Sequence, residues 1–118
     1  MIPNTELELT LQEVIKICSK VRLADKTLTF DSFGSNDLRI STEAFLDEHG
    51  FDVFDGERII NELKEKDYIK GPVDNYVRER KQKLWVFITN YRDLSVYVKL
   101  MIYNKRRCVA VISLHDNL

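Results

Sequence analysis

Three short runs of β-branched and aromatic residues dominate the last third of the sequence. They span residues 84–88, 96–103 and 108–115 and are separated by short polar connections. Such runs are typical of adjacent antiparallel strands, because β-branched and aromatic side chains pack well on a pleated surface. The sequence therefore predicts a three-stranded meander, and the rest of the chain has to cover at least one of its faces.

The middle run indicates which face is covered. Its even positions from 96 to 102 are all apolar, whereas its odd positions are Tyr97, Lys99, Met101 and Tyr103. Successive side chains of a strand point to opposite faces, so the even positions are predicted to face the core. The odd positions then form a face that is available for chemistry.

The last run is predicted to continue this division. If the alternation is strict, the residues that face the core are Cys108, Ala110, Ile112 and Leu114. The residues that face the other side are then Val109, Val111, Ser113 and His115. A three-residue connection at 104–106 would pair Tyr103 with Arg107 and set Tyr97 across from Ser113. We therefore expect one surface to be shared by Tyr97, Lys99, Ser113 and His115.

Helical patterns occupy most of the first half of the chain. Thr10 and Glu13 fit a capping box, and apolar residues then recur at helical spacing as far as Val21. Residues 26–30 alternate like a short strand, and residues 31–37 are rich in turn-forming residues. We expect a helix, a short strand and a turn in this order.

Two further helices are predicted before the meander. One begins near Ser41–Thr42 and is ended by His49–Gly50, and the next is capped by Asp52 or Asp55. The last of these helices should run out within residues 66–72, where glycine and proline make its continuation costly.

Length and composition narrow the class of protein. A chain of 118 residues that is 44% hydrophobic and 31% charged is ordinary for one globular domain, here residues 1–118. No apolar run approaches the roughly 20 residues that span a bilayer, and the first residues do not resemble a secretory signal. We therefore expect a cytoplasmic protein without a membrane partner. Cys18 and Cys108 lie in apolar patterns without metal-ligand spacing, so both are expected to be buried free thiols.

Charge is distributed unevenly, although the formal net charge is only −1. Residues 1–63 contain 6 Lys/Arg and 13 Asp/Glu, whereas residues 64–118 contain 12 and 6. A basic half that also carries the polar sheet face favours contact with a phosphate backbone, although two solvated surfaces that differ by chance explain the charges equally well. The predicted positive patch would gather Lys70, Lys83, Lys99 and Arg107.

Residues 73–83 are predicted to form a polar loop. Eleven residues are long for a connector within one domain, which is typical of a functional or mobile segment. This segment contains the cations Arg78, Arg80, Lys81 and Lys83.

Short motifs in a particular order give the sequence a family resemblance. Gly-rich phosphate loops, paired-cysteine metal sites and Gly-x-Ser-x-Gly elbows are absent from it. Over roughly residues 10–116 the chain instead resembles the MqsR family of toxin endoribonucleases. The motifs that carry the resemblance are Phe54-Asp55-Gly56, Asp67-Tyr68-Ile69-Lys70, Trp85, Val96-Tyr97-Val98-Lys99 and Val111-Ile112-Ser113-Leu114-His115.

The resemblance implies a fold, an activity and a set of site residues. The fold would be α/β (α+β) and RelE-like, with N-terminal helices on one side of a twisted, mainly antiparallel sheet that ends in the meander. The activity would be that of an mRNA interferase that uses no metal or other cofactor and is held in check by a cognate antitoxin protein, with the involvement of a ribosome left open. Lys70 falls on the family's catalytic lysine, Tyr97 on its strand tyrosine, and His115 on a basic position of the last strand. Val86 is a departure, because the best-known member has glutamine directly after the tryptophan.

These residue types suit RNA cleavage without a metal. A base must take the 2′-hydroxyl proton, an acid must protonate the leaving 5′-oxygen, and cations must stabilise the charged transition state. Histidine changes protonation near neutral pH, so His115 suits proton transfer, Lys70 supplies charge, and Tyr97 orients the substrate or donates a proton. Contacts to RNA are expected from Lys99, Lys83, Arg78, Arg80 and Ser113.

A simpler interpretation assigns the same residues to structure and solvent. His115 would then be a surface residue, Lys99 and Tyr97 would lie along the sheet, and Lys70 would be a cation at a helix end. Trp85 is predicted to be a core residue rather than a platform for stacking bases, because apolar residues flank it on both sides. The chain would then be a non-catalytic regulatory or protein-binding module on the same scaffold.

Overall fold

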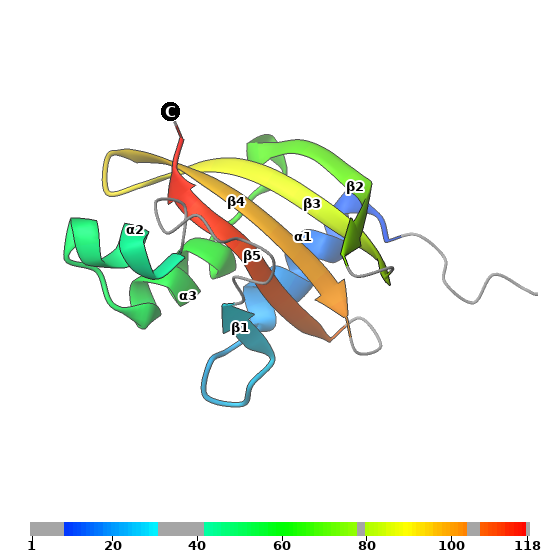
Figure 1. The fold of residues 1–118 in the computed structure, drawn as a ribbon, viewed down its shortest axis with the longest axis horizontal. Coiled ribbons are helices and arrows are strands. Elements are labelled where there is room, and N and C mark those ends of the chain that lie inside the picture. Colours follow the sequence, from blue (N-terminus) through cyan, green and yellow to red (C-terminus); the bar gives the residue numbers. More distant parts are fainter. Residues whose placement is uncertain (1–8, 31–41, 78–79, 104–106, 118) are drawn as a thin grey trace, which may run out of the picture.

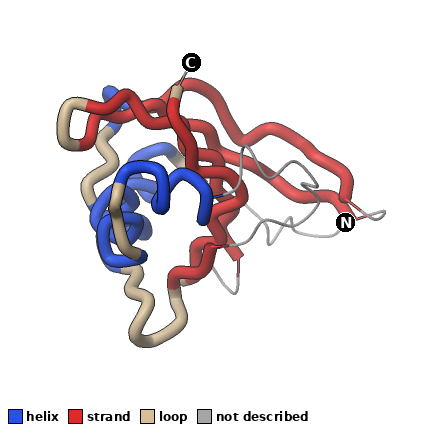
Figure 2. The backbone as a smooth tube through the Cα atoms, turned by 60° about the vertical axis from the view of Figure 1, so that its left-hand side comes forward, coloured by secondary structure: helices blue, strands red, loops and turns tan. Residues whose placement is uncertain are grey.

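The computed structural model describes residues 9–30, 42–77, 80–103 and 107–117, and it has an α+β architecture. The helices are α1 (Leu11–Lys20), α2 (Thr42–His49) and α3 (Val53–Asn61), followed by the short 3-10 helix η2 (Glu65–Asp67). The strands are β1 (Leu28–Phe30), β2 (Tyr68–Val77), β3 (Arg80–Tyr91), β4 (Leu94–Tyr103) and β5 (Cys108–Asp116). The strands form a five-stranded sheet with the helices on one side of it (Figure 1, Figure 2).

The caps of the helices are where the sequence predicts them. The Thr10 hydroxyl accepts a hydrogen bond from the Glu13 N–H at 3.2 Å, and the Glu13 carboxylate accepts one from the Thr10 N–H at 3.0 Å. Asp52 caps α3 by accepting hydrogen bonds from the backbone of the next turn. Gly50 follows α2 with a φ of 67°, a conformation that favours glycine at a helix end.

The third helix is shorter than predicted, and its first turn is tied to the sheet. It ends at Asn61, and η2 then carries the chain into β2. The Tyr91 hydroxyl of β3 donates a 2.6 Å hydrogen bond to the Asp55 carboxylate of α3. This bond, together with the one from the Asp52 N–H, holds the pKa of Asp55 below its usual value.

The strand order is β1-β5-β4-β3-β2, and it confirms the predicted meander of β3, β4 and β5. β1 lies within the predicted short strand and pairs with β5 in parallel, from Leu28 opposite Val109 to Phe30 opposite Val111. All other neighbouring strands are antiparallel. The sheet is therefore mixed, with one short parallel strand at its edge.

The prediction of a polar loop over residues 73–83 is wrong. This segment is the end of β2 and the start of β3, which pair from Val73 opposite Leu84 to Val77 opposite Arg80. The prediction relied on the polarity of the segment, but cross-strand hydrogen bonds hold a ribbon together without a buried face. Opposite charges contribute as well, because Lys83 Nζ lies 3.7 Å from the directly opposed Asp74 carboxylate.

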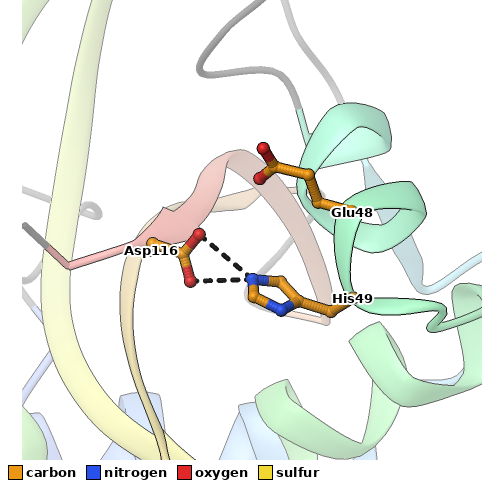
Figure 3. A group of neighbouring side chains, drawn as sticks. All are labelled: Glu48, His49 and Asp116. Atoms are coloured by element: carbon orange, nitrogen blue, oxygen red, sulfur yellow. Dashed lines mark hydrogen bonds and ion pairs between the residues drawn. The ribbon is translucent and has the colours of Figure 1, made fainter.

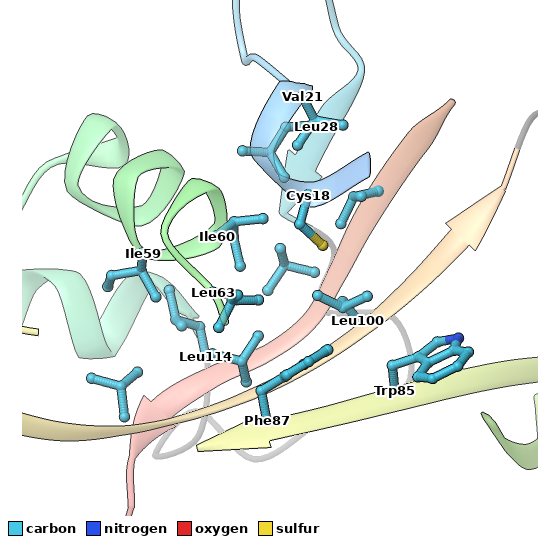
Figure 4. Close-up of a cluster of buried hydrophobic side chains, with 14 of the residues drawn as sticks. Cys18, Val21, Leu28, Ile59, Ile60, Leu63, Trp85, Phe87, Leu100 and Leu114 are labelled. Atoms are coloured by element: carbon cyan, nitrogen blue, oxygen red, sulfur yellow. The ribbon is translucent and has the colours of Figure 1, made fainter. Parts of the chain in front are cut away.

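One face of the sheet, here called the core face, packs on the helices (Figure 4). In β4 it carries Val96, Val98 and Leu100, each with no exposed surface, as the alternation predicts. The other main contributors are Val14, Cys18, Ile59, Ile60, Trp85, Phe87, Val109, Val111 and Leu114. Trp85 is thus a core residue, and both cysteines are buried free thiols, as predicted. Burial raises the pKa of Cys18 to about 12.

The predicted register of β4 and β5 is wrong by one residue in the half of β5 nearest the connection. Tyr103 lies opposite Cys108 and not Arg107, so Val109 and Val111 face the core. A register shift between Lys99 and Leu100 then leaves Ile112 without a partner in β4, which is the pattern of a β-bulge. Beyond it, Leu114 faces the core, and Ser113 and His115 lie on the opposite face, here called the second face.

No helix in the part of the chain that the structure describes is both long and apolar enough to cross a membrane.

Candidate active site on the second face of the sheet

The second face brings Tyr97 and His115 into direct contact. Tyr97 of β4 lies opposite His115 of β5, and the two rings are stacked, with centroids 4.6 Å apart and planes inclined by 14°. The expected partner of Tyr97 was Ser113, but the pairing of Tyr103 with Cys108 and the bulge at Ile112 each move the register by one residue, so Tyr97 pairs two residues further along β5. The shared surface therefore exists with a different pair of residues at its centre.

The hydrogen bond that His115 makes defines which of its ring nitrogens is free. Nδ1 lies 2.8 Å from the backbone oxygen of Asp116. A carbonyl oxygen only accepts hydrogen bonds, so Nδ1 carries the proton and donates. In the neutral ring, Nε2 then has the free lone pair. The atom of His115 that can accept a proton from a substrate is Nε2.

Tyr97 keeps its proton in this setting. Burial on the sheet raises the pKa of its phenol above the ordinary tyrosine value, because the charged phenolate would lose solvation. At neutral pH Tyr97 is therefore a hydrogen-bond donor beside the His115 ring. This supports a role in orienting or protonating a substrate oxygen rather than in removing a proton.

Lys99 and Ser113 form the next row of the second face. They lie opposite each other, one step along the sheet from the Tyr97–His115 pair. Residues two apart on one strand are separated by roughly 6–7 Å, and diagonal cross-strand neighbours by roughly 7–8 Å. Lys99 is half-buried and lies within side-chain reach of the stacked rings.

Lys70 continues the same row on the far side of Val86. Lys70 lies opposite Val86, and Val86 lies opposite Lys99. Two strand spacings, roughly 10 Å, therefore separate the backbones of the two lysines. Val86 is buried and apolar, so at this position the chain supplies no polar group between the two cations.

The backbone around Lys70 is held by residues on both sides of it. The Tyr68 hydroxyl donates a 2.6 Å hydrogen bond to the carbonyl oxygen of Gly71. Gly71 has a φ of 141°, and a Cβ there would lie 2.9 Å from the carbonyl oxygen of Leu84. Only glycine suits this close approach of the β2 backbone to the β3 backbone. The pairing of β2 with β3 is irregular on both sides of Lys70.

The other predicted RNA contacts are not gathered at this site. Lys83 shares its side of β3 with Trp85, so the strand alternation directs it to the core-face side, where it pairs with Asp74. Arg107 immediately precedes β5, at the end of the strand opposite His115 and roughly 26 Å from it. The predicted patch of Lys70, Lys83, Lys99 and Arg107 is therefore not one compact surface. Arg78 and the side chain of Arg80 lie outside the described residues.

The sequence did not reveal a histidine–aspartate pair behind the site. His49 Nε2 lies 2.9 and 3.1 Å from the two carboxylate oxygens of Asp116, the residue after His115 (Figure 3). His49 was recognised only as part of a helix stop. Residues 67 positions apart carry no local pattern that would indicate this contact.

The same pair belongs to a group of potential metal ligands. Donor atoms of Glu48, His49 and Asp116 all lie within 4.8 Å of one another, the one group of this kind in the described parts of the chain. His49 already bonds both oxygens of Asp116, and a carboxylate only accepts, so Nε2 of His49 carries a proton. A metal ion would have to displace that proton.

Comparisons of this chain with protein-family models, with curated proteins and with solved structures found no match.

Proposed function

We propose that this protein is a metal-independent endoribonuclease and that the second face of the sheet binds and cleaves RNA. The observation that carries the proposal is the stacked Tyr97–His115 pair, with Nε2 of His115 unprotonated in the neutral ring and Lys99 in the adjacent row. Together they supply a base, a donor and a cation on one surface, which are the groups that 2′-hydroxyl attack requires.

In the proposed reaction, Nε2 of His115 takes the proton of a 2′-hydroxyl. The 2′-oxygen then forms a bond to the adjacent phosphorus, and the bond from phosphorus to the 5′-oxygen breaks. A protonated group, Lys70 or Tyr97, gives its proton to the departing 5′-oxygen. The products are a 2′,3′-cyclic phosphate and a free 5′-hydroxyl, so atoms and charge balance without a metal ion.

The cations would act at different points of the RNA backbone. Lys99 lies one row from His115 and is the nearer candidate for the phosphate at the cleavage site. Lys70 lies about two strands further along the same row, a spacing that suits the leaving side or a neighbouring phosphate. Ser113, opposite Lys99, adds a hydroxyl that can donate to a phosphate oxygen.

The resemblance to the MqsR family supports a biological setting for this activity. The family's catalytic lysine and strand tyrosine fall on Lys70 and Tyr97, and both positions lie on the second face. In this setting the protein is the toxin of a toxin–antitoxin system, its substrate is mRNA, and a cognate antitoxin protein blocks it in the cytoplasm. The twisted sheet with helices on one side is compatible with a RelE-like scaffold.

The direct test is incubation of the purified protein with a defined mRNA in the presence of EDTA. We expect cleavage that leaves cyclic phosphate ends, and a loss of roughly 10²-fold or more in His115→Ala. Lys20→Ala is the control, because Lys20 is exposed at the end of α1 on the opposite side of the sheet. RNA binding should weaken steeply with added salt, since phosphate contacts release counterions.

Two outcomes would contradict the proposal. Cleavage that EDTA abolishes would exclude the metal-independent mechanism. A folded protein that cuts no RNA but binds a partner protein would favour the alternative, a non-catalytic regulatory or protein-binding module. The apolar Val86 in the middle of the Lys70–Lys99 row is the feature that favours this alternative.

A further inference from the structure

The end of β5 presents neighbouring residues to opposite sides of the sheet. His115 lies on the second face and stacks on Tyr97. Asp116 lies opposite Val96, a residue of the core face, and its side chain reaches α2 (Figure 3). The backbone carbonyl of Asp116 is the hydrogen-bond acceptor for Nδ1 of His115. Asp116 therefore connects the helical layer to the proposed catalytic surface through its own main chain.

Among the described strands, none pairs with β5 beside Asp116 on the side away from β4. β1 pairs only with residues 109–111 of β5. The peptide unit between Asp116 and Asn117 is anchored on its other side, where the Asn117 N–H donates to the Ser95 carbonyl of β4 at 2.9 Å. Because the peptide unit is planar, this bond turns the Asp116 carbonyl away from β4, toward the edge where His115 Nδ1 reaches it.

His49 holds the side chain of the same residue. Its Nε2 contacts both carboxylate oxygens of Asp116, and its ring lies 5.0 Å from the Phe45 ring and 5.6 Å from the Phe51 ring. The pair is partly shielded from water, with exposed fractions of 23% for the His49 side chain and 33% for that of Asp116. A ring packed between two aromatic neighbours has little rotational freedom. The contact therefore fixes Asp116 from the helical side.

We propose that His49 is a positioning residue for His115. By holding the Asp116 carboxylate, it keeps the Asp116 carbonyl in place to accept the hydrogen bond from Nδ1–H, and so keeps Nε2 of His115 free to act as the base. The kinetic part of this inference rests on the proposed function, whereas the state of the His115 ring can be measured without it.

The chain has only two histidines, which makes the measurement direct. In His49→Ala the remaining imidazole signals belong to His115, and ¹⁵N NMR distinguishes a ring protonated on Nδ1 from one protonated on Nε2. We expect the neutral ring of the parent to carry its proton on Nδ1. In His49→Ala we expect a shift toward the Nε2–H form, which free histidine prefers. Asp47→Ala is the matched control, because Asp47 is exposed on α2 and lies outside the group formed by Glu48, His49 and Asp116.

A conservative variant separates positioning from folding. The amide of His49→Gln can still donate to the Asp116 carboxylate, so it should restore the parent tautomer at least in part. In the RNA cleavage assay, His49→Ala should lower kcat roughly 10- to 100-fold with little change in KM, since the RNA-contacting groups remain. All variants would be compared under conditions where circular dichroism shows them to be folded.

The outcomes are distinct. An unchanged His115 tautomer in folded His49→Ala would overturn the inference, and an equal shift in Asp47→Ala would overturn it as well, by assigning the effect to α2 as a whole. A parent protein that cuts no RNA would overturn the proposed function and the kinetic role of His49, while the NMR result would still decide whether His49 controls the His115 ring.

Discussion

The two faces of β4 differ more than any other two surfaces of the sheet. On the core face, Val96, Val98 and Leu100 are fully buried under the helices. On the second face, Tyr97 and Lys99 keep part of their surface exposed and have polar atoms to offer. The even residues of β4 thus pack in the core, and its odd residues supply polar groups to the proposed site. Substitutions one position apart should therefore separate stability from activity.

The largest effect is expected on the core face. Phe87→Ala removes a fully buried ring that contacts Tyr68 edge to face, and we expect a loss of about 3–5 kcal/mol in the free energy of unfolding. Ile88→Ala, one position along on the second face, should cost clearly less because Ile88 is only partly buried. Chemical denaturation of both variants measures the difference. Equal losses of unfolding free energy would show that the two faces contribute equally to stability.

Removal of the nearest cation should affect the second face alone. Lys99→Ala should lower RNA cleavage roughly 10²-fold, because a charge aimed at the transition state is lost. Lys99→Arg should retain more activity if charge is the contribution. Lys16→Ala on α1 makes the same change of charge on the helical side and should leave cleavage unchanged. A Lys99→Ala variant that cleaves at the parent rate would move the assignment to Lys70.

A smaller effect is expected from the phenol of Tyr97. Tyr97→Phe keeps the stacked ring and removes only the hydroxyl, so we expect roughly a tenfold loss of cleavage, the scale of one hydrogen bond. The free energy of unfolding should change little. Tyr97→Ala removes the stack as well, and its additional loss would measure what the ring contributes. If Tyr97→Phe were as impaired as Tyr97→Ala, proton donation would be the main role of Tyr97.

The smallest effect is expected far from the second face, in the way stability falls at acidic pH, here called the acid limb. The Asp55 pKa is lowered in the folded state, mainly by the Tyr91 hydrogen bond. Its contribution is therefore fully present above the unfolded pKa of about 3.9 and is lost as the pH falls through the folded value. Tyr91→Phe should flatten this limb in thermal denaturation between about pH 5 and 2 while cleavage at neutral pH stays unchanged. An unaltered limb would assign the acid sensitivity to other carboxylates.

Local patterns predicted the helices and the meander well. The capping box of α1, the Asp52 cap of α3 and the even positions of β4 depend on neighbours within a few residues, which the sequence displays directly. The β2–β3 ribbon was missed because its stability comes from cross-strand hydrogen bonds that carry no hydrophobic signature. The register of β5 was missed for two reasons: Tyr103 pairs with Cys108 and not Arg107, and the bulge at Ile112 then adds one more residue, which a strict alternation rule does not include.

The site was predictable only in part. The shared face of Tyr97 and His115 followed from the residue types, and the family resemblance indicated the same residues. The stacking of the two rings depends on the bulge, and the contact of His49 with Asp116 joins α2 to the last strand. Contacts between distant elements depend on the packing of the whole domain, so short sequence patterns do not indicate them.

The position of β5 in the sheet has a consequence for the order of events during synthesis. β5 follows the other described elements in the sequence, yet it lies between β1 and β4 and brings Val109, Val111 and Leu114 into the core. Until it has left the ribosome, β1 has no strand partner, and the long-range pairing that slows folding is still to be made. The same strand carries His115. A growing chain therefore has neither the complete five-stranded sheet nor the proposed base until β5 is added.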